Sequence, residues 1–268
     1  MGELSFDEKS TGIIFGFLNQ IFQLAKYFNY PRFIFAWDSK KSYRKDVYPD
    51  YKRKDKKIAQ DLLELLDISR PQFTTLRFQI LPKIGFVNNF IQAGIEADDI
   101  IAIITKSILK PFEDHDQYII VSVDNDLYQL LSPSVSMFNP KTKKLYTEND
   151  FIKEFRIRPY DWQNVKALAG CDGDNVKGIS GVGIKTAIRW FKGELREGKK
   201  ADTISALSTL KIYLANLPLV TLPYERTLPV QLYEDVFSFK CFEDVCLEYG
   251  LKSFLKKGNY EEWKKILS

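Results

Sequence analysis

The pattern of hydrophobic positions predicts one long helix and two buried strands in the first half of the chain. Between residues 11 and 29, apolar side chains recur every three or four positions, which is typical of a helix with one face on the core. Two short apolar runs, RFIFAW (32–37) and YIIVSV (118–123), are typical of parallel strands buried on both faces. Each run stops at an aspartate, Asp38 or Asp124.

Helical and strand patterns alternate along the chain, which predicts an α/β fold with a parallel sheet. Helical spacing returns around 78–90, again after the acidic residues at 96–99, and from about residue 160, with a glycine-rich interruption at 170–187. In open parallel sheets, ligands bind beyond the carboxyl ends of the strands. The aspartates that follow the two strands are therefore expected at the active edge.

Composition argues against membrane-spanning and disulfide-stabilised classes of protein. At 268 residues, 45% of them hydrophobic, the chain can bury a substantial core as one large domain or two lobes. Its apolar runs fall far short of the ~20 residues that span a bilayer, and the opening MGELSFDEKS resembles no export signal. Cys171, Cys241 and Cys246 fit neither a disulfide framework nor a paired-CxxC zinc site. We expect a soluble cytoplasmic protein with reduced thiols.

Positive charge is concentrated in one segment, although the net charge of the chain is only +4. Residues 39–57 carry nine Lys or Arg against three Asp, a local net charge of +6, interleaved with Tyr43, Tyr48 and Tyr51. Such a segment suits a nucleic-acid strand, since basic side chains contact phosphates and aromatic rings stack on unpaired bases. The tyrosines could equally pack against the protein.

Carboxylates gather after the predicted strands and at one helix start. GIEADD (94–99) opens a helix, where acidic residues are common because the helix dipole favours them. Together with Asp38, Asp124 and Asp126, this segment would bring five or six carboxylates to one sheet edge. Like charges gather so closely only when they are protonated or bind cations. Oxygen ligands without clustered His or Cys favour Mg²⁺ or Mn²⁺ over zinc.

A glycine-rich turn, GISGVG (178–183), precedes a predicted helix. Such a turn can bind phosphate through backbone N–H groups and the helix N-terminus, although glycine-rich helix connections are also common for steric reasons. The basic residues Lys177, Lys185 and Arg189 surround the turn. This combination suits a contact with a DNA backbone that reads no sequence.

Five motifs occur in a fixed order: FAWD, YRKDVYPDYK, GIEADD, VSVDNDLYQLL and GDNVKGISGVGIKTA. In this order they resemble the 5′ nuclease family, which includes bacteriophage flap endonucleases and the nuclease domains of bacterial DNA polymerase I. The resemblance covers about residues 5 to 225. It implies a parallel-sheet, PIN-like nuclease core at 1–158, with a basic helical arch at 39–85, and a helical DNA-binding lobe with a helix-hairpin-helix turn at 159–268.

The resemblance also implies roles for particular residues. It assigns as metal ligands Asp38, Glu96, Asp98, Asp124 and Asp126 for a first ion, Asp174 with its neighbour Asp172 for a second, and Asp99 behind them. Arg44, Tyr51 and Lys52 match the catalytic basic segment at the foot of the arch. Lys177, Gly181, Gly183, Lys185, Thr186 and Arg189 match the turn that grips duplex DNA, often with a K⁺ ion. The implied reaction is in-line attack of water on a phosphodiester with two Mg²⁺ or Mn²⁺ ions.

Two departures from the family pattern bear on the metal sites. A first strand ending in aspartate precedes the family's segment that LSFDEKSTGIIFGFL matches, whereas this chain begins at that segment. We therefore expect weak metal binding unless another segment or chain fills the gap. In addition, Cys171 replaces the first aspartate of the family's GDxxDN, with Asp172 one residue along, which puts the second metal in doubt.

The leading hypothesis is a structure-specific 5′ nuclease acting on flap or 5′-ended DNA, in a bacterial or phage-infected cytoplasm. Two alternatives stay open. One is a junction-binding protein of the same fold with weakened catalysis. The other is a haloacid dehalogenase-type phosphatase, suggested by DNDL after a strand but disfavoured by Tyr128, where that family has Thr or Val. His115 is interpreted as a solvated loop residue.

Overall fold

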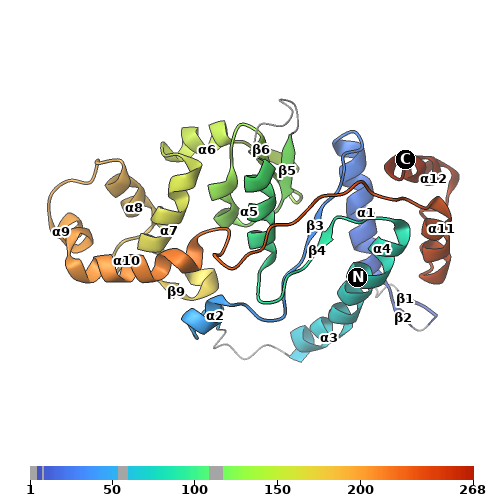
Figure 1. The fold of residues 1–268 in the computed structure, drawn as a ribbon, viewed down its shortest axis with the longest axis horizontal. Helices are drawn as coiled ribbons and strands as arrows, with labels where there is room; N and C mark the ends of the chain where they lie inside the picture. Colours follow the sequence, from blue (N-terminus) through green and yellow to red (C-terminus); the bar gives the residue numbers. More distant parts are fainter. Residues whose placement is uncertain (1–4, 8, 54–59, 109–116) are drawn as a thin grey trace. The chain divides into compact units, whose positions relative to one another are not determined.

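The computed structural model describes residues 5–7, 9–53, 60–108 and 117–268 (Figure 1). His115 and the last part of the basic segment, 54–57, lie outside the described residues. The chain forms two compact units. Unit 1 comprises Met1–Phe35, Asp55–Phe90 and Gln231–Ser268, and unit 2 comprises Ala36–Lys54 and Ile91–Val230.

Unit 1 is mainly helical. Its elements are β1 (Ser5–Phe6), β2 (Lys9–Ser10), α1 (Gly12–Tyr27), α3 (Gln60–Thr75), the π-helical turn η1 (Leu76–Ile80), α4 (Leu81–Ile84), β4 (Asn89–Phe90), α11 (Phe239–Glu248) and α12 (Lys257–Ile266). Trp263 is fully buried, with its ring centroid 4.4 Å from that of Phe242 and 5.4 Å from that of Phe254. Gln72 Oε1 accepts the Ile13 N–H at 2.9 Å, which satisfies an amide at the start of α1.

The helix predicted around 78–90 ends at Ile84 instead. Gly85 has φ +113°, and a Cβ there would lie 2.0 Å from the backbone O of Val236, so only glycine fits where this segment crosses. The next residues form β4, and β3 (Phe35–Ala36) joins it in a two-stranded sheet. The backbone conformation and close contact at Gly85 thus end the helix, although the apolar spacing continues beyond it.

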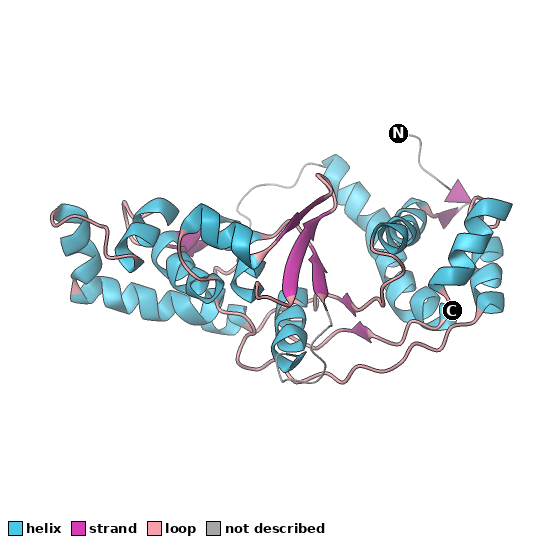
Figure 2. Cartoon of the chain, turned by 90° about the horizontal axis from the view of Figure 1, so that it is seen from above, coloured by secondary structure: helices cyan, strands magenta, loops and turns pink. Residues whose placement is uncertain are grey.

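Unit 2 contains a three-stranded sheet. Strand β5 (Tyr118–Val121) pairs in parallel with β6 (Val135–Asn139), which pairs antiparallel with β7 (Lys144–Tyr146). Figure 2 shows these strands in magenta with helices beside them. The helical elements of the unit are α2 (Arg44–Val47), α5 (Ala97–Ile108), η2 (Asn125–Leu130), α6 (Glu148–Phe155), η3 (Pro159–Asp161), α7 (Trp162–Ala169), η4 (Asp172–Asp174), α8 (Ile184–Phe191), α9 (Lys199–Ser205) and α10 (Leu207–Val220). A short hairpin, β8 (Gly170–Cys171) and β9 (Val176–Lys177), surrounds η4.

The prediction that both apolar runs are buried on both faces was wrong. In β5, Ile120 is buried, but Val121 is 42% exposed, and both residues of β3 are only half-buried. The reason is pairing: among the described residues, β5 hydrogen-bonds only to β6 and β3 only to β4, so each lies at the edge of a small sheet.

Aromatic residues dominate the core of unit 2. Phe151 and Trp162 pack with ring centroids 5.6 Å apart, and Tyr128 lies 5.8 Å from Trp162 and 5.0 Å from Tyr146. Tyr128 is therefore a packing residue. A capping box starts α6. Thr147 Oγ1 accepts the Asp150 N–H, and the Asp150 carboxylate accepts the Thr147 N–H.

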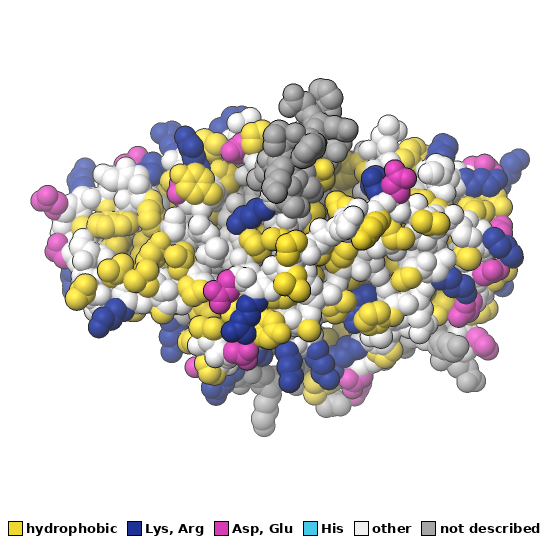
Figure 3. Space-filling model, viewed as in Figure 1, with side chains coloured by type: hydrophobic (Ala, Val, Ile, Leu, Met, Phe, Trp, Pro, Cys, Tyr) yellow, Lys and Arg dark blue, Asp and Glu magenta, His cyan; other side chains and the backbone are white. Residues whose placement is uncertain are grey.

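Within the described part of the chain, no single helix has the length and apolar composition to cross a membrane, whereas α9 and α10, bent by 63°, satisfy that test only as a pair. Leu207, Leu210 and Leu214 of α10 are 73%, 46% and 55% exposed. Hydrophobic side chains are visible on the surface in the region of these helices (Figure 3).

Candidate active site

Carboxylates line a small cavity in unit 2. The cavity has a volume of about 20 Å³, which is space for about one water molecule. Its lining residues are Arg44, Tyr51, Lys52, Glu96, Asp98, Asp124, Asp126, Asp174, Leu219, Val220 and Leu222. Five of these are acidic, and they come from three separate segments of the chain.

Helix starts position two of the predicted carboxylates. Asp124 is the N-cap of η2, and its Oδ1 accepts the Asp126 N–H at 2.9 Å. Asp38 Oδ1 accepts the Ala97 N–H at 2.9 Å, at the first residue of α5. Asp98 follows in the first turn of that helix. The hydrogen bond from Ala97 therefore holds the carboxylate after β3 at the start of α5. Asp124, after β5, lines the same cavity as Asp98.

Burial and mutual repulsion change the protonation of this group. Burial, together with the nearby charges of Asp124 and Asp38, raises the pKa of Asp98 to about 7. Burial also raises the pKa of Asp174. The positive charge of Lys52 opposes this rise, and the negative charge of Asp126 adds to it. A bound cation would stabilise the charged form of these buried carboxylates.

Glu96 connects three residues of the basic segment. It is 9% exposed and accepts hydrogen bonds from Tyr51 Oη at 2.9 Å, Lys52 Nζ at 2.9 Å and Arg44 Nη1 at 3.3 Å. Lys52 Nζ also lies 3.7 Å from Asp174 Oδ1. Burial alone would lower the pKa of Lys52, but Glu96, Asp174 and Asp38 raise it, so the ammonium stays charged.

Arg44 and Tyr51, which the resemblance assigns to the catalytic basic segment, are each only 2% exposed. Their catalytic role stays a prediction. Arg44 makes a two-bond ion pair with Asp99, which is itself fully buried. Only Lys52 of the three, with a side chain 40% exposed, is open to solvent at the cavity. An arginine in a basic run can thus be buried when it forms an ion pair with a buried carboxylate.

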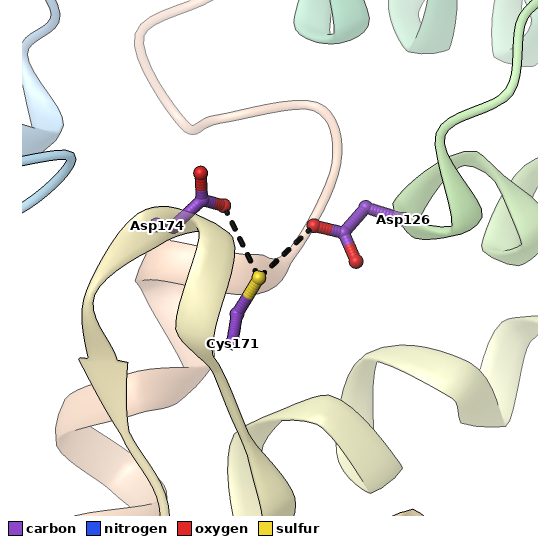
Figure 4. Close-up of side chains that lie close together, drawn as sticks. All are labelled: Asp126, Cys171 and Asp174. Carbon is purple, nitrogen blue, oxygen red and sulfur yellow. Dashed lines mark hydrogen bonds between the residues drawn. The ribbon is translucent and has the colours of Figure 1, made fainter.

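Asp126 and Asp174, which line the cavity, form a cluster with Cys171 (Figure 4). The Cys171 thiol lies 3.6 Å from Asp126 Oδ2 and 3.6 Å from Asp174 Oδ2. Burial raises the pKa of this thiol to about 11, and both carboxylates add to the effect. Lys166 Nζ lies 2.6 Å from Asp126 Oδ1. No sequence motif marks Lys166 as part of this cluster; the only signal is its place in the last turn of α7, before Cys171.

Two predicted ligands lie elsewhere. Asp172 is exposed on η4 and is not among the residues that line the cavity. Its role as a metal ligand stays a prediction. Cys171, one residue earlier, is the last residue of β8 and is buried, whereas Asp172 starts η4 and is exposed. Asp99 lies behind the cavity, with both oxygens engaged by Arg44 and the Tyr224 N–H.

The glycine-rich turn precedes α8. Gly181 has φ +76° with open space around it, and Gly183 is the N-cap of α8. A Cβ at Gly178 would lie 2.1 Å from Ala169 O, so this glycine serves packing rather than ligand access. The side chains of Lys177, Lys185 and Arg189 are exposed, and Thr186 is half-buried in the first turn of α8. These positions are open to a ligand, and a role in DNA binding stays a prediction.

The sequence is similar to those of known 5′-3′ exonucleases. The sequence model described as "5′-3′ exonuclease, N-terminal resolvase-like domain" matches residues 4–156. A 5′-3′ exonuclease of Buchnera aphidicola is 32% identical over 182 residues, which are 67% of this chain and 59% of that protein. One of Aquifex aeolicus is 30% identical over 221 residues, covering 76% and 72%. The chain thus spans 59% of the length of the first relative.

The fold also matches a solved structure. The T5 D15 protein co-crystallised with metal ions superposes with a TM-score of 0.64 over 94% of this chain and 90% of that one. The two sequences are 24% identical. This likeness supports the α/β architecture with helical additions that the sequence predicts.

Proposed function

Since the chain belongs to the family of 5′-3′ exonucleases with an N-terminal resolvase-like domain, we propose that it is a divalent-metal-dependent 5′ nuclease. Its substrate would be DNA with a free 5′ end or a 5′ flap, and its reaction the hydrolysis of a phosphodiester bond. The observation that carries this proposal is the cavity into which Glu96, Asp98, Asp124, Asp126 and Asp174 converge.

The donor set fits a hard divalent cation on one side of the cavity. Glu96, Asp98 and Asp124 in the lining, with Asp38 close enough to raise the pKa of Asp98, offer oxygen atoms only, which suits Mg²⁺ or Mn²⁺. The raised pKa of Asp98 reflects unbalanced negative charge that a cation would neutralise. When bound, divalent ions supply positive charge beside the phosphodiester and activate the attacking water.

The chain's own residues orient the substrate around this group. Lys52, held by Glu96 and partly exposed, is placed to contact a phosphate oxygen near the carboxylates. The backbone also fixes it, because the Lys52 N–H donates to Asp174 O at 2.8 Å. Arg44 and Tyr51 act indirectly, by holding Glu96 in place. Leu219, Val220 and Leu222 form an apolar wall that limits the access of water.

Duplex DNA would bind at the glycine-rich turn. The exposed side chains of Lys177, Lys185 and Arg189 suit phosphate contacts. Backbone N–H groups around Gly181 and Gly183 can donate to an anionic phosphate oxygen, and backbone carbonyl oxygens there can frame a K⁺ site. In this proposal residues 1–158 carry the nuclease core and residues 159–268 the lobe that holds the duplex. Such binding is sequence-independent and weakens as salt rises.

One observation favours a second candidate, a junction-binding protein with weakened catalysis. Cys171 stands among the carboxylates where an oxygen ligand would serve Mg²⁺ better. The phosphatase hypothesis has no such support, because Tyr128 lies in the aromatic core of unit 2.

A cleavage experiment separates the two candidates. The wild-type chain is incubated with matched 5′-flap and 3′-flap duplexes in Mg²⁺, in Mn²⁺ and in EDTA, and flap binding is measured in parallel. A 5′ nuclease cleaves the 5′ flap in either metal, leaves the 3′ flap intact and is inactive in EDTA. Tight binding of the flap without cleavage in either metal would instead support the junction-binding protein.

A further inference from the structure

Cys171 is placed to bind a metal ion rather than only to fill space. It is 8% exposed, and its Sγ lies between two carboxylates, 3.6 Å from Asp126 Oδ2 and 3.6 Å from Asp174 Oδ2. One ligand atom from each of the three residues lies within 4.8 Å of the others (Figure 4). The three side chains point toward a common centre from η2 and from the 170–174 turn.

The hydrogen-bonding capacity of the thiol does not match its surroundings. A thiol has one hydrogen, so it can donate to Asp126 or to Asp174 but satisfies both only by sharing. Cys171 packs with Ala167, Val176 and Leu219 in an apolar cluster, as buried cysteines commonly do. Its sulfur nevertheless faces the two carboxylates. A cation at the common centre would instead be coordinated by both carboxylates and by the sulfur after its proton leaves to solvent.

Sulfur changes which ion the cluster of Asp126, Cys171 and Asp174 prefers. Thiolate ligands select Zn²⁺ and other thiophilic ions, whereas oxygen ligands suit Mg²⁺ and Mn²⁺. Three protein ligands with an open fourth position are also the usual arrangement of a reactive zinc site. The two sides of the cavity therefore differ, because the group around Asp98 and Asp124 has oxygen donors only.

We propose that Asp126, Cys171 and Asp174 form a second metal subsite that prefers a thiophilic divalent ion to Mg²⁺. This inference rests on the proposed function, since it assigns the ion of one subsite in that nuclease. Lys166 sets the strength of the subsite. Its ammonium, 2.6 Å from Asp126 Oδ1, neutralises one ligand and competes with the incoming ion.

Cadmium is the probe for this subsite, because a cadmium–thiolate bond gives an ultraviolet charge-transfer band. Metal-free wild-type chain, Cys171→Ser and Cys171→Asp are titrated with Cd²⁺ and, separately, with Mg²⁺. The other thiols, Cys241 and Cys246, stay in every variant and provide a constant background. Circular dichroism and thermal melting confirm that each variant is folded.

The wild-type chain is expected to show a saturable band that Cys171→Ser lacks. Cys171→Asp should bind Mg²⁺ more tightly and lower the preference for Cd²⁺ over Mg²⁺ by at least about tenfold. Lys166→Met should strengthen the Cd²⁺ response while keeping the band. An equal band in wild type and Cys171→Ser, or an unchanged preference in Cys171→Asp, would overturn the proposal.

The same preparations separate this inference from the proposed function. Mg²⁺-dependent cleavage of a 5′ flap without a Cys171-dependent band means that the nuclease stands and the thiophilic subsite is wrong. A Cys171-dependent band in a chain that cleaves no flap in Mg²⁺ or Mn²⁺ means that the subsite stands and the proposed function is wrong.

Discussion

Arg44 and Asp99 form a two-bond ion pair in the interior of unit 2. Nη1 donates to Oδ2 at 2.6 Å and Nη2 donates to Oδ1 at 2.7 Å, and neither side chain is more than 2% exposed. Asp99 also accepts the Tyr224 N–H, and Arg44 Nη2 donates to Thr221 O. The pair therefore connects α2, α5 and the 221–224 segment beneath the carboxylates of the cavity.

Breaking this pair should destabilise the protein rather than only weaken DNA binding. Removing either partner leaves a buried charge without a counterion, so Arg44→Ala and Asp99→Asn should each lower the free energy of unfolding by about 3–5 kcal/mol. Urea denaturation measures this, with the exposed neighbour Lys45→Ala as the control, expected within about 0.5 kcal/mol of wild type. If Arg44→Ala is as stable as Lys45→Ala, the pair contributes nothing to stability.

Lys52 and Lys185 should affect different steps. Lys52 lies at the cavity and Lys185 at the glycine-rich turn, both exposed. Lys52→Ala should slow flap cleavage by at least about tenfold with little change in duplex binding, because its phosphate contact lies beside the reacting bond. Lys185→Ala should weaken binding to flap and plain duplex alike. It should also reduce the slope of log binding constant against log salt concentration by about one, because one phosphate contact is lost. Equal losses on both substrates for both variants would contradict this division.

Stability of the metal-free protein should depend on pH through Asp98. Its pKa in the folded protein is about 7, raised from 3.8, so the folded state binds more protons than the unfolded state between pH 4 and pH 7. The free energy of unfolding therefore falls as pH rises through this window, by at most about 4 kcal/mol from this group. Asp98→Asn in EDTA should flatten the profile. A profile as steep as that of wild type would assign the effect to other groups.

The capping box of α6 offers a test of stability away from the cavity. Thr147→Ala removes the acceptor for the Asp150 N–H and should lower the free energy of unfolding by about 1 kcal/mol. Flap cleavage should be unchanged at temperatures where the variant is folded. Thr147→Ser, which keeps the hydroxyl, is the matched control and should stay close to wild type in thermal melting.

The sequence predicted the fold class and most of the carboxylates because both follow from local patterns. The apolar runs that stop at Asp38 and Asp124 alternate with helical patterns, which predicts strands of an α/β fold. Backbone N–H groups at the helix starts at 97 and 125 then fix the two aspartate side chains by hydrogen bonds. Family membership and the fold are confirmed by comparison with related proteins. The metal roles of the individual carboxylates stay predictions.

Sequence patterns could not predict which charged residues are buried. Arg44 and Lys52 lie in one basic run, yet Arg44 is 2% exposed and the Lys52 side chain is 40% exposed. The difference arises from the fully buried Asp99, 55 positions away in the chain. Likewise, Cys171 is paired with Val176 at the end of β8 and is buried, whereas Asp172 starts η4 and is exposed, and composition does not reveal where the strand ends.

The most direct test of the account compares Asp124→Asn with Asp172→Asn in single-turnover cleavage of a 5′-flap duplex with Mg²⁺. Asparagine at 124 keeps the oxygen that caps η2 but removes the charge that faces the cavity, and Asp172 is an exposed carboxylate outside the cavity. We expect Asp124→Asn to lose at least about 100-fold in cleavage rate while binding the flap as tightly as wild type, and Asp172→Asn to cleave normally. Normal cleavage by Asp124→Asn, or an equal loss in both variants, would contradict the assignment of the cavity as the active site.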